Sequence, residues 1–192
     1  MTAAPSEPAE SRAALFAARA ASVSADVRPA PVSTVPALVV EIIRAAGATQ
    51  AVVDTATRTA FPALSQALAA AGVDPVDPCS SAEMLAQVGA GVSLAAFGIA
   101  ETGSAVLAAG DRGERLVGML PAVHVVLLRE ADLLADLDAA GARLRALTTA
   151  DPPLPYVSFV TGPSRTADIE RVLTIGVQGP RALHVLVIDA DP

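Results

Sequence analysis

The sequence predicts an α/β fold with a mainly parallel sheet that is covered by helices. Nearly continuous apolar segments, of which residues 123–128 are the clearest, are typical of strands buried on both faces. Segments with helical spacing alternate with them, as in layered α/β proteins. The 192 residues can bury a substantial core. We expect an N-terminal helix and Pro-rich linker over residues 1–36, followed by the α/β domain over residues 37–192.

The first half of the chain predicts helices and short strands in turn. Residues 10–21 have the pattern of a helix, and the proline-rich residues 27–36 are expected to be an irregular linker, either a docking arm or a loosely packed extension. A helix over residues 35–46 precedes a short buried strand at residues 51–54. Gly72 is placed to end a second helix over residues 61–71.

The second half continues the alternation. Ser80 and Glu83 have the spacing of a capping box and predict a helix up to residue 88. Apolar segments at 92–100 and 104–108 flank Glu101-Thr102-Gly103, which indicates a hairpin or a sharp strand reversal. Leucines at helical spacing predict a helix over residues 131–148. Strands are expected at the segments that remain, residues 123–128, 156–161 and 182–188.

Composition excludes several classes of chemistry. The single cysteine, Cys79, cannot form an internal disulfide or supply the ligands of an iron–sulfur cluster, so we expect no cofactor bound by this chain. His124 and His184 lie too far apart for a helical zinc-protease motif. All thirteen cationic side chains are arginines, which excludes a Schiff-base lysine and a phosphate-binding P-loop lysine. The net charge of −7 argues against a nucleic-acid partner.

The sequence also bears on the compartment. Apolar runs are interrupted well before the roughly 20 residues that a membrane-spanning helix needs. The first 21 residues lack the basic start and apolar centre of a secretory signal. We therefore expect a cytoplasmic protein without a membrane span.

Three polar segments with glycine are expected near the carboxyl ends of strands, where ligands usually bind in open α/β sheets: residues 98–104, 161–164 and 176–180. In Thr161-Gly162-Pro163-Ser164, glycine allows a tight turn and Ser164 can cap a short helix that starts near Arg165. Free N–H groups there, together with Arg165, would bind an anion. The structural alternative is a capped turn without a ligand.

Glu101 is the only carboxylate in the apolar region 88–109. It is a candidate nucleophile or general base if it faces a cavity, and a solvated turn residue if it does not. His124 and His184 lie on predicted strands, where hydrogen-bonded structural histidines are the usual case and a direct chemical role is the alternative. Asp54, at the end of a strand, is a weaker candidate.

Four segments in order resemble a known family: GIAETGSAVL, LPAVHVVLLR, PYVSFVTGPSRTADIE and GVQGPRALHVLVID. Together they are similar to the lactate-utilisation protein C family, whose module is the LUD domain, over residues 83–189. The resemblance implies a fold like those of ribose-5-phosphate isomerase, glucosamine-6-phosphate deaminase and coenzyme A transferases. It also implies a role in oxidising L-lactate to pyruvate beside iron–sulfur partner proteins that carry the clusters.

The resemblance places functional weight on particular positions. One is the candidate catalytic residue Glu101, and the others are candidate ligand-binding residues: Thr102, Gly103, Thr161, Gly162, Pro163, Ser164, Arg165, Asp168, Glu170, Gly179, Pro180 and His184. Position 178 is Gln where the family commonly has His. No metal ligand is implied.

Three functions are compatible with these residues. The first is a subunit without an iron–sulfur cluster in a lactate oxidation system, with an anion- or partner-binding pocket at strand ends. The second is a free-standing enzyme that acts on a phosphorylated or acyl substrate with Glu101 as acid, base or nucleophile. The third is a regulatory domain that binds without catalysing a reaction.

Overall fold

In the computed structural model of the protein, residues 11–151, 153–166, 174–176 and 179–189 are described. Seven α-helices are found in these residues: α1 Arg12–Ser22, α2 Val35–Ala45, α3 Thr55–Ala60, α4 Ala63–Ala70, α5 Ala82–Leu85, α6 Arg112–Val117 and α7 Leu137–Thr148. Short 3-10 turns occur at η1 Val32–Thr34 and η2 Glu130–Asp132. None of the helices in this part of the chain is long and apolar enough to cross a membrane.

A six-stranded sheet forms the centre of the fold, and every strand pair in it is parallel. Its strands, in spatial order, are β1 Asp26–Ala30, β12 Ala182–Ile188, β7 Val123–Arg129, β4 Ala90–Leu94, β2 Gln50–Val53 and β3 Asp74–Val76. The predicted covered parallel sheet is confirmed. The apolar runs of β7 and β12 are buried on both faces, as expected for central parallel strands.

A second sheet packs beside the first. It has four strands, in the order β8 Leu133–Leu134, β5 Phe97–Ile99, β6 Ser104–Ala109 and β9 Tyr156–Val160. Strands β5 and β6 pair antiparallel, which confirms the predicted hairpin. Strand β9 pairs antiparallel with β6 and so belongs to this sheet, not to the central one. A further two-stranded pair joins β10 Arg165–Thr166 to β11 Thr174–Ile175.

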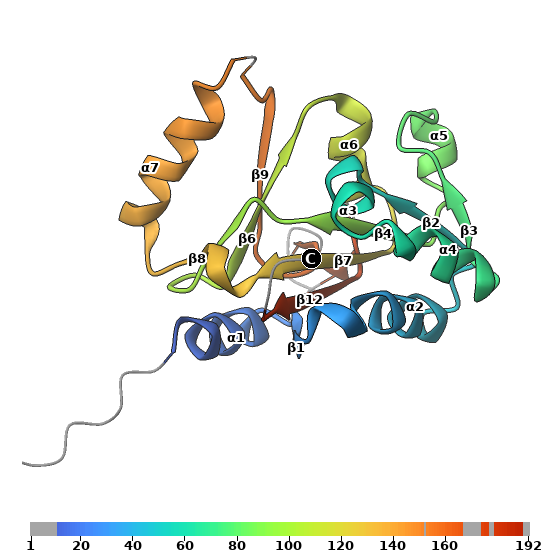
Figure 1. Cartoon of the computed structure of the whole chain (residues 1–192), viewed down its shortest axis with the longest axis horizontal. Coiled ribbons are helices and arrows are strands. Elements are labelled where there is room, and N and C mark those ends of the chain that lie inside the picture. The colour runs from blue at the N-terminus through green and yellow to red at the C-terminus, as the bar shows by residue number, and fades with distance from the viewer. Residues whose placement is uncertain (1–10, 152, 167–173, 177–178, 190–192) are drawn as a thin grey trace, which may run out of the picture.

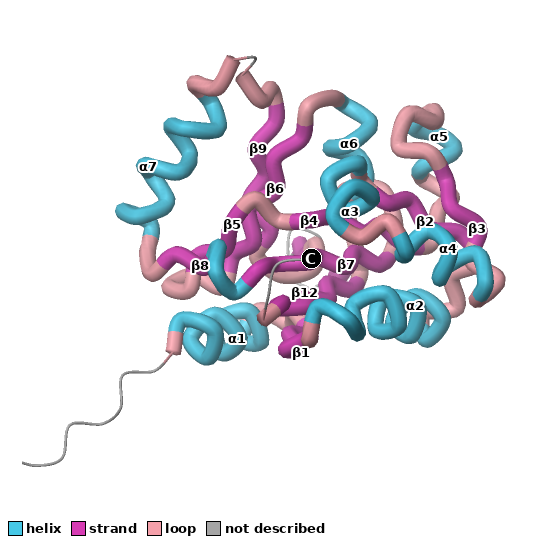
Figure 2. Tube along the Cα trace, viewed as in Figure 1, coloured by secondary structure: helices cyan, strands magenta, loops and turns pink. Residues whose placement is uncertain are grey.

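The two sheets and the helices form layers (Figure 1). Side chains of α2 and α4 pack on one face of the central sheet, against residues such as Val125 and Leu127. Phe16 and Ala20 of α1 pack on the opposite face, with Val126, Leu128 and residues of the four-stranded sheet. Helix α7 covers the outer face of the four-stranded sheet, beside which it lies in Figure 2. Apolar burial on each face drives the layering.

The N-terminal segment differs from its prediction. Residues 27–30 were expected to be part of an irregular linker, but they lie in β1, which pairs in parallel with β12 along its whole length. Pro29 is tolerated because β1 is the edge strand of the central sheet, where a missing N–H costs little. The linker prediction is wrong for these residues.

Three local predictions are also corrected. The predicted helix over residues 131–148 begins only at Leu137, because the side chain of Asp136 accepts a hydrogen bond from the N–H of Ala139 and caps the helix there. Ser81 caps α5 through the N–H of Met84, so Ser80 is not the capping residue. The segment at Arg165 begins a strand, not a short helix.

Candidate functional site

The three glycine-containing segments predicted to form a site lie side by side. The hydroxyl oxygens of Ser104 and Thr161 are 2.6 Å apart, and Thr102 donates a hydrogen bond to Ser104 at 2.8 Å. The N–H of Ser164 donates to the carbonyl of Pro180 at 2.9 Å. This junction therefore links the hairpin turn, the turn after β9 and the segment before β12.

The position of this junction agrees with the prediction only in part: residues 100–103 and 161–164 follow the strands β5 and β9, but these strands belong to the four-stranded sheet. The segment 176–180 precedes β12, so it lies at the amino end of that central strand and not at a carboxyl end. The side chains of Thr161 and Arg165 are exposed, whereas Pro163 is buried. Asp168, Glu170 and Gln178 lie outside the described residues. A ligand-binding role for the junction stays a prediction.

The packing of helix α1 explains why glycine is needed at two positions of these turns. Gly103 and Gly162 have φ angles of +66° and +90°, which L side chains rarely adopt. A Cβ atom on Gly103 would lie 2.4 Å from the backbone nitrogen of Ala20, and one on Gly162 would lie 2.6 Å from the carbonyl oxygen of Val23. The two turns need glycine because the C-terminal end of α1 rests directly on them.

Glu101 does not reach a described cavity. Its side chain is exposed, and its carboxylate accepts a hydrogen bond from the N–H of Leu137 at 3.1 Å. Leu137 is the first residue of α7, and a carboxylate at that place satisfies a free N–H group and favours the helix dipole. This contact favours a structural role for Glu101, and its catalytic role stays a prediction.

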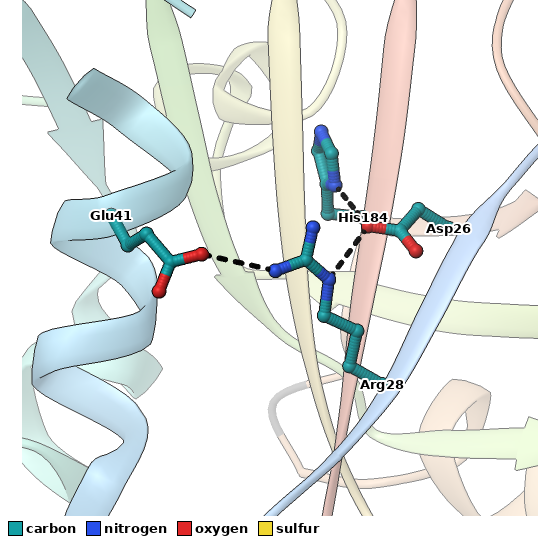
Figure 3. Close-up of polar contacts among 4 residues, drawn as sticks. All are labelled: Asp26, Arg28, Glu41 and His184. Carbon is teal, nitrogen blue, oxygen red and sulfur yellow. Dashed lines mark hydrogen bonds and ion pairs between the residues drawn. The ribbon is translucent and has the colours of Figure 1, made fainter. Parts of the chain in front are cut away.

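His184 lies in a cluster of polar side chains at one edge of the central sheet (Figure 3). Its Nδ1 lies 2.9 Å from the carboxylate of Asp26 on the neighbouring strand, and Arg28 contacts the same carboxylate at 2.9 Å. Arg28 also reaches Glu41 on α2 at 3.2 Å. Partial burial acts to raise the pKa of Asp26, but the hydrogen bonds from His184 and Arg28 outweigh it and lower that pKa.

A small cavity lies elsewhere, at the carboxyl ends of β2 and β4. Its volume is about 50 Å³, and its polar lining comes from Asp54, Ser93, Glu114, Arg115 and Ser158. Strands β2 and β4 are neighbours. Within the central sheet, the strand that follows β2 in the sequence is β3, on one side, and the strand that follows β4 is β7, on the other side. Ligands in open α/β sheets bind at this kind of switch point.

Asp54 is the central acid of this cavity. It follows β2 directly, caps α3 by accepting from the N–H of Thr57 at 2.7 Å, and accepts from the N–H of Leu94 at 3.1 Å. Burial raises the pKa of Asp54 to about 6, and the charge of Glu114 adds to this effect while the hydrogen bonds oppose it. A carboxyl group with such a pKa can exchange a proton near neutral pH.

Helix α6 supplies two charged residues of the cavity lining, Glu114 and Arg115. Glu114 accepts hydrogen bonds from both the N–H and the hydroxyl of Thr55, the first residue of α3. The guanidinium of Arg115 lies over the ring of Tyr156, 5.3 Å from its centroid. The cavity therefore has two carboxylates and one permanent cation at its lining.

Behind the cavity, Ser93 is hydrogen-bonded to a buried imidazole. The Nε2 atom of His124 lies 3.1 Å from the hydroxyl oxygen of Ser93, and Nδ1 of His124 has no partner among the described residues. Burial lowers the pKa of His124 to about 4, so the ring is neutral at physiological pH. Gly118 leaves room for this ring, since a Cβ there would lie 2.8 Å from Cε1 of His124.

Sequence reasoning largely missed this cavity. Asp54 was only a weak candidate, and Ser93, Glu114, Arg115 and Ser158 were not candidates. One signal was present, because Asp54 directly follows a short apolar strand at a position where ligands bind in α/β folds. The other residues come from separate elements without a spacing motif. Within the described ranges, no three His, Cys, Asp or Glu side chains gather as a metal site would require.

Comparison with known proteins places this fold in a family. The model of the LUD domain family matches residues 15–188, which is most of the sequence. The chain belongs to the LUD domain family. The match reaches into the segment that contains α1 and β1, in agreement with their packing on the central sheet.

Several curated relatives of this LUD domain protein carry informative names. Lactate utilization protein C of Halalkalibacterium halodurans is 32% identical over 109 residues, which is 56% of this chain and 47% of the relative. The uncharacterized protein YkgG of Escherichia coli is 33% identical over 119 residues, or 59% of this chain and 51% of the relative. The chain thus spans about half the length of the curated relatives it matches.

One solved structure supports the fold of the LUD domain. A DUF162 family protein from Deinococcus radiodurans matches with a TM-score of 0.66, over 91% of this chain and 94% of that chain. The two sequences are 22% identical, so this likeness supports the fold and carries no argument about activity.

Proposed function

We propose that this protein takes part in the utilisation of L-lactate, as a subunit without an iron–sulfur cluster in a system that oxidises lactate to pyruvate. The observation that carries the proposal is the LUD family match over residues 15–188, together with relatives named lactate utilization protein C. Iron–sulfur partner proteins supply the electron-transfer groups in this proposal. A chain with a single, exposed cysteine does not supply the four thiolates of a typical cluster.

Two surfaces of the molecule are assigned different tasks in this proposal. The cavity beside Asp54 is the small-ligand pocket at strand ends, and the junction of glycine turns is the partner-binding surface. Exposed Thr161 and Arg165 support the second assignment, because an exposed guanidinium can pair with a carboxylate on a partner protein. The contact of Glu101 with Leu137 argues against the alternative enzyme in which Glu101 attacks the substrate.

The proposal is tested in the native cells. A strain that lacks the protein should lose growth on L-lactate and keep growth on pyruvate, and the tagged protein should co-purify with cysteine-rich iron–sulfur proteins. Normal growth of the deletion strain on L-lactate, together with purification of the protein alone, would contradict it.

A charge-reversal pair sharpens the assignment of the partner surface. Arg165→Glu should reduce the recovery of partner proteins. Arg143→Glu, which changes an exposed arginine on α7 that contacts Asp132, is the matched control and should not. Equal recovery with both variants would remove the glycine junction from the proposal and leave the role in lactate utilisation standing.

A further inference from the structure

The volume of the Asp54 cavity limits what it can hold. About 50 Å³ is several times the roughly 10–15 Å³ that one water molecule requires by this measure. The cavity therefore has room for a ligand of a few heavy atoms. A nucleotide or a coenzyme A moiety is far too large to be enclosed there.

Acceptors and donors in the cavity come from different elements. The carboxylates of Asp54 and Glu114, from the end of β2 and from α6, accept hydrogen bonds. Ser93 on β4, Ser158 on β9 and Arg115 on α6 can donate. A ligand that satisfies both sets carries an anionic acceptor group and, close to it, a group with a proton to donate.

The tautomer of His124 determines whether the hydroxyl of Ser93 can donate a hydrogen bond to the ligand. The unpartnered Nδ1 of His124 is less costly as a bare nitrogen than as a buried N–H, so the proton is expected on Nε2. Nε2–H then donates to the oxygen of Ser93, 3.1 Å away. The hydroxyl proton of Ser93 is thereby left to point into the cavity as a donor.

The rest of the wall is apolar. Leu107 on β6, Val160 on β9 and Met119 contribute to the lining, and the side chains of Arg115 and Met119 are partly open to solvent. Apolar side chains favour a short alkyl group over a second charged group. A dicarboxylate would also meet repulsion from Glu114.

We propose that this cavity binds a small hydroxymonocarboxylic acid. Its carboxylate is held by Arg115 with the hydroxyls of Ser93 and Ser158, and its own hydroxyl donates to Asp54 or Glu114. The inference deepens the proposed function and rests on it for the choice of L-lactate as the probe. No bond is made or broken in this step.

The test is isothermal titration calorimetry of the purified full chain with L-lactate, and with propionate, which has the same carbon chain without the hydroxyl. Saturable binding of L-lactate is expected, with propionate at least about tenfold weaker, because propionate has no hydroxyl to donate a hydrogen bond to Asp54 or Glu114. Absence of saturable binding up to roughly 10 mM, above the usual range for substrates, would overturn the inference. So would equal affinity for the two ligands.

Variants locate the site. Arg115→Gln and Ser158→Ala change side chains outside the core and should each weaken L-lactate binding by about tenfold without unfolding the chain. Asp54→Asn tests the acceptor, although this residue also caps α3. Arg143→Gln, on α7 and outside the cavity lining, is the matched control for Arg115→Gln and should bind as the unaltered chain does. Full binding by both Arg115→Gln and Ser158→Ala would contradict the proposed site.

The outcome separates this inference from the proposed function. If the protein co-purifies with iron–sulfur proteins and supports growth on L-lactate but the purified chain binds no lactate, the role stands and the cavity assignment is wrong. If lactate binds in the cavity but the deletion strain grows normally, the cavity assignment stands and the role in lactate utilisation is wrong.

Discussion

The hydroxyl oxygens of Ser104 and Thr161 are 2.6 Å apart although 57 residues separate them in the sequence. Ser104 is almost fully buried at the start of β6, and Thr161 directly follows β9. The bond fixes the hairpin turn against the turn after β9. It directly links the two glycine-containing turns.

Removal of this bond should be measurable. Ser104→Ala is expected to lower the free energy of unfolding by about 1–2 kcal/mol, because the hydrogen bonds to Thr102 and Thr161 are both lost. Urea unfolding measures the change, and Ser33→Ala, at an exposed site, is the control. In a double-mutant cycle with Thr161→Val, additive losses would show that the two hydroxyls are not coupled.

The glycines under α1 should not accept a side chain. Gly103→Ala and Gly162→Ala are each expected to destabilise the fold by at least about 1 kcal/mol, because the φ angle is positive and α1 occupies the space of the Cβ. Gly141→Ala is the matched control. Gly141 lies inside α7 with nothing near its Cβ position, so alanine there should stabilise by roughly 0.5–1 kcal/mol. Equal thermal denaturation of all three variants would refute the packing argument.

Asp54 should make the protein less stable as the pH rises. Its pKa is raised in the folded chain to about 6 from 3.8, so the folded state binds the proton more tightly and stability is lost between about pH 4 and pH 6. The loss is on the order of 3 kcal/mol. Asp54→Asn should remove this dependence in urea unfolding at a series of pH values. A stability curve for Asp54→Asn that matches the curve of the unaltered protein would contradict this argument.

His124 should act in the opposite sense over nearly the same range. Its pKa is lowered in the folded chain to about 4 from 6.5, so stability is present above pH 6.5 and is lost as the pH falls towards 4. The two dependences largely cancel in the unaltered protein. In the variant His124→Gln, the free energy of unfolding should fall with rising pH. In the variant Asp54→Asn, it should increase with rising pH. Parallel curves for the two variants would show that neither group titrates as argued.

The contact between Asp26 and His184 should contribute little to the stability of the fold, and its contribution should depend on pH. Asp26→Asn is expected to lower stability at pH 7 by at most about 1 kcal/mol, because the side chains are partly exposed. The pKa of Asp26 is lowered in the folded chain, so its contribution is present above pH 3.8 and disappears as the pH falls below it. Glu41→Gln, which breaks only the exposed pair with Arg28, should have a smaller effect. A larger loss of stability from Glu41→Gln than from Asp26→Asn would contradict this prediction.

Much of the fold could be predicted because the strands and helices have clear patterns in the local sequence. The runs that form β7 and β12 are apolar throughout, and the flanking segments have clear helical periods. β1 was missed because proline disfavours a strand, and only the place of β1 at the sheet edge makes Pro29 acceptable. The spacing of Leu133 also fits a helix, and only the cap at Asp136 shows where α7 begins.

The candidate site was predictable to a lesser degree. The glycine-containing segments were recognised as neighbours, and Ser104 and Thr161 join two of them. The cavity beside Asp54 was not foreseen because its residues come from β2, β4, α6 and β9, which only the order of the strands brings together. Burial and Glu114 raise the pKa of Asp54, and neither influence can be read from the sequence around it.

The pairing of β1 with β12 affects how the protein is made. Asp26 emerges from the ribosome 158 residues before its partner His184, and in the described part of the chain β1 has no other strand beside it. For most of synthesis, the backbone groups of β1 that pair with β12 in the complete fold therefore have no strand partner. Such long-range pairing is slow to form. The nascent chain is then exposed to proteases and to wrong strand partners until the last strand arrives.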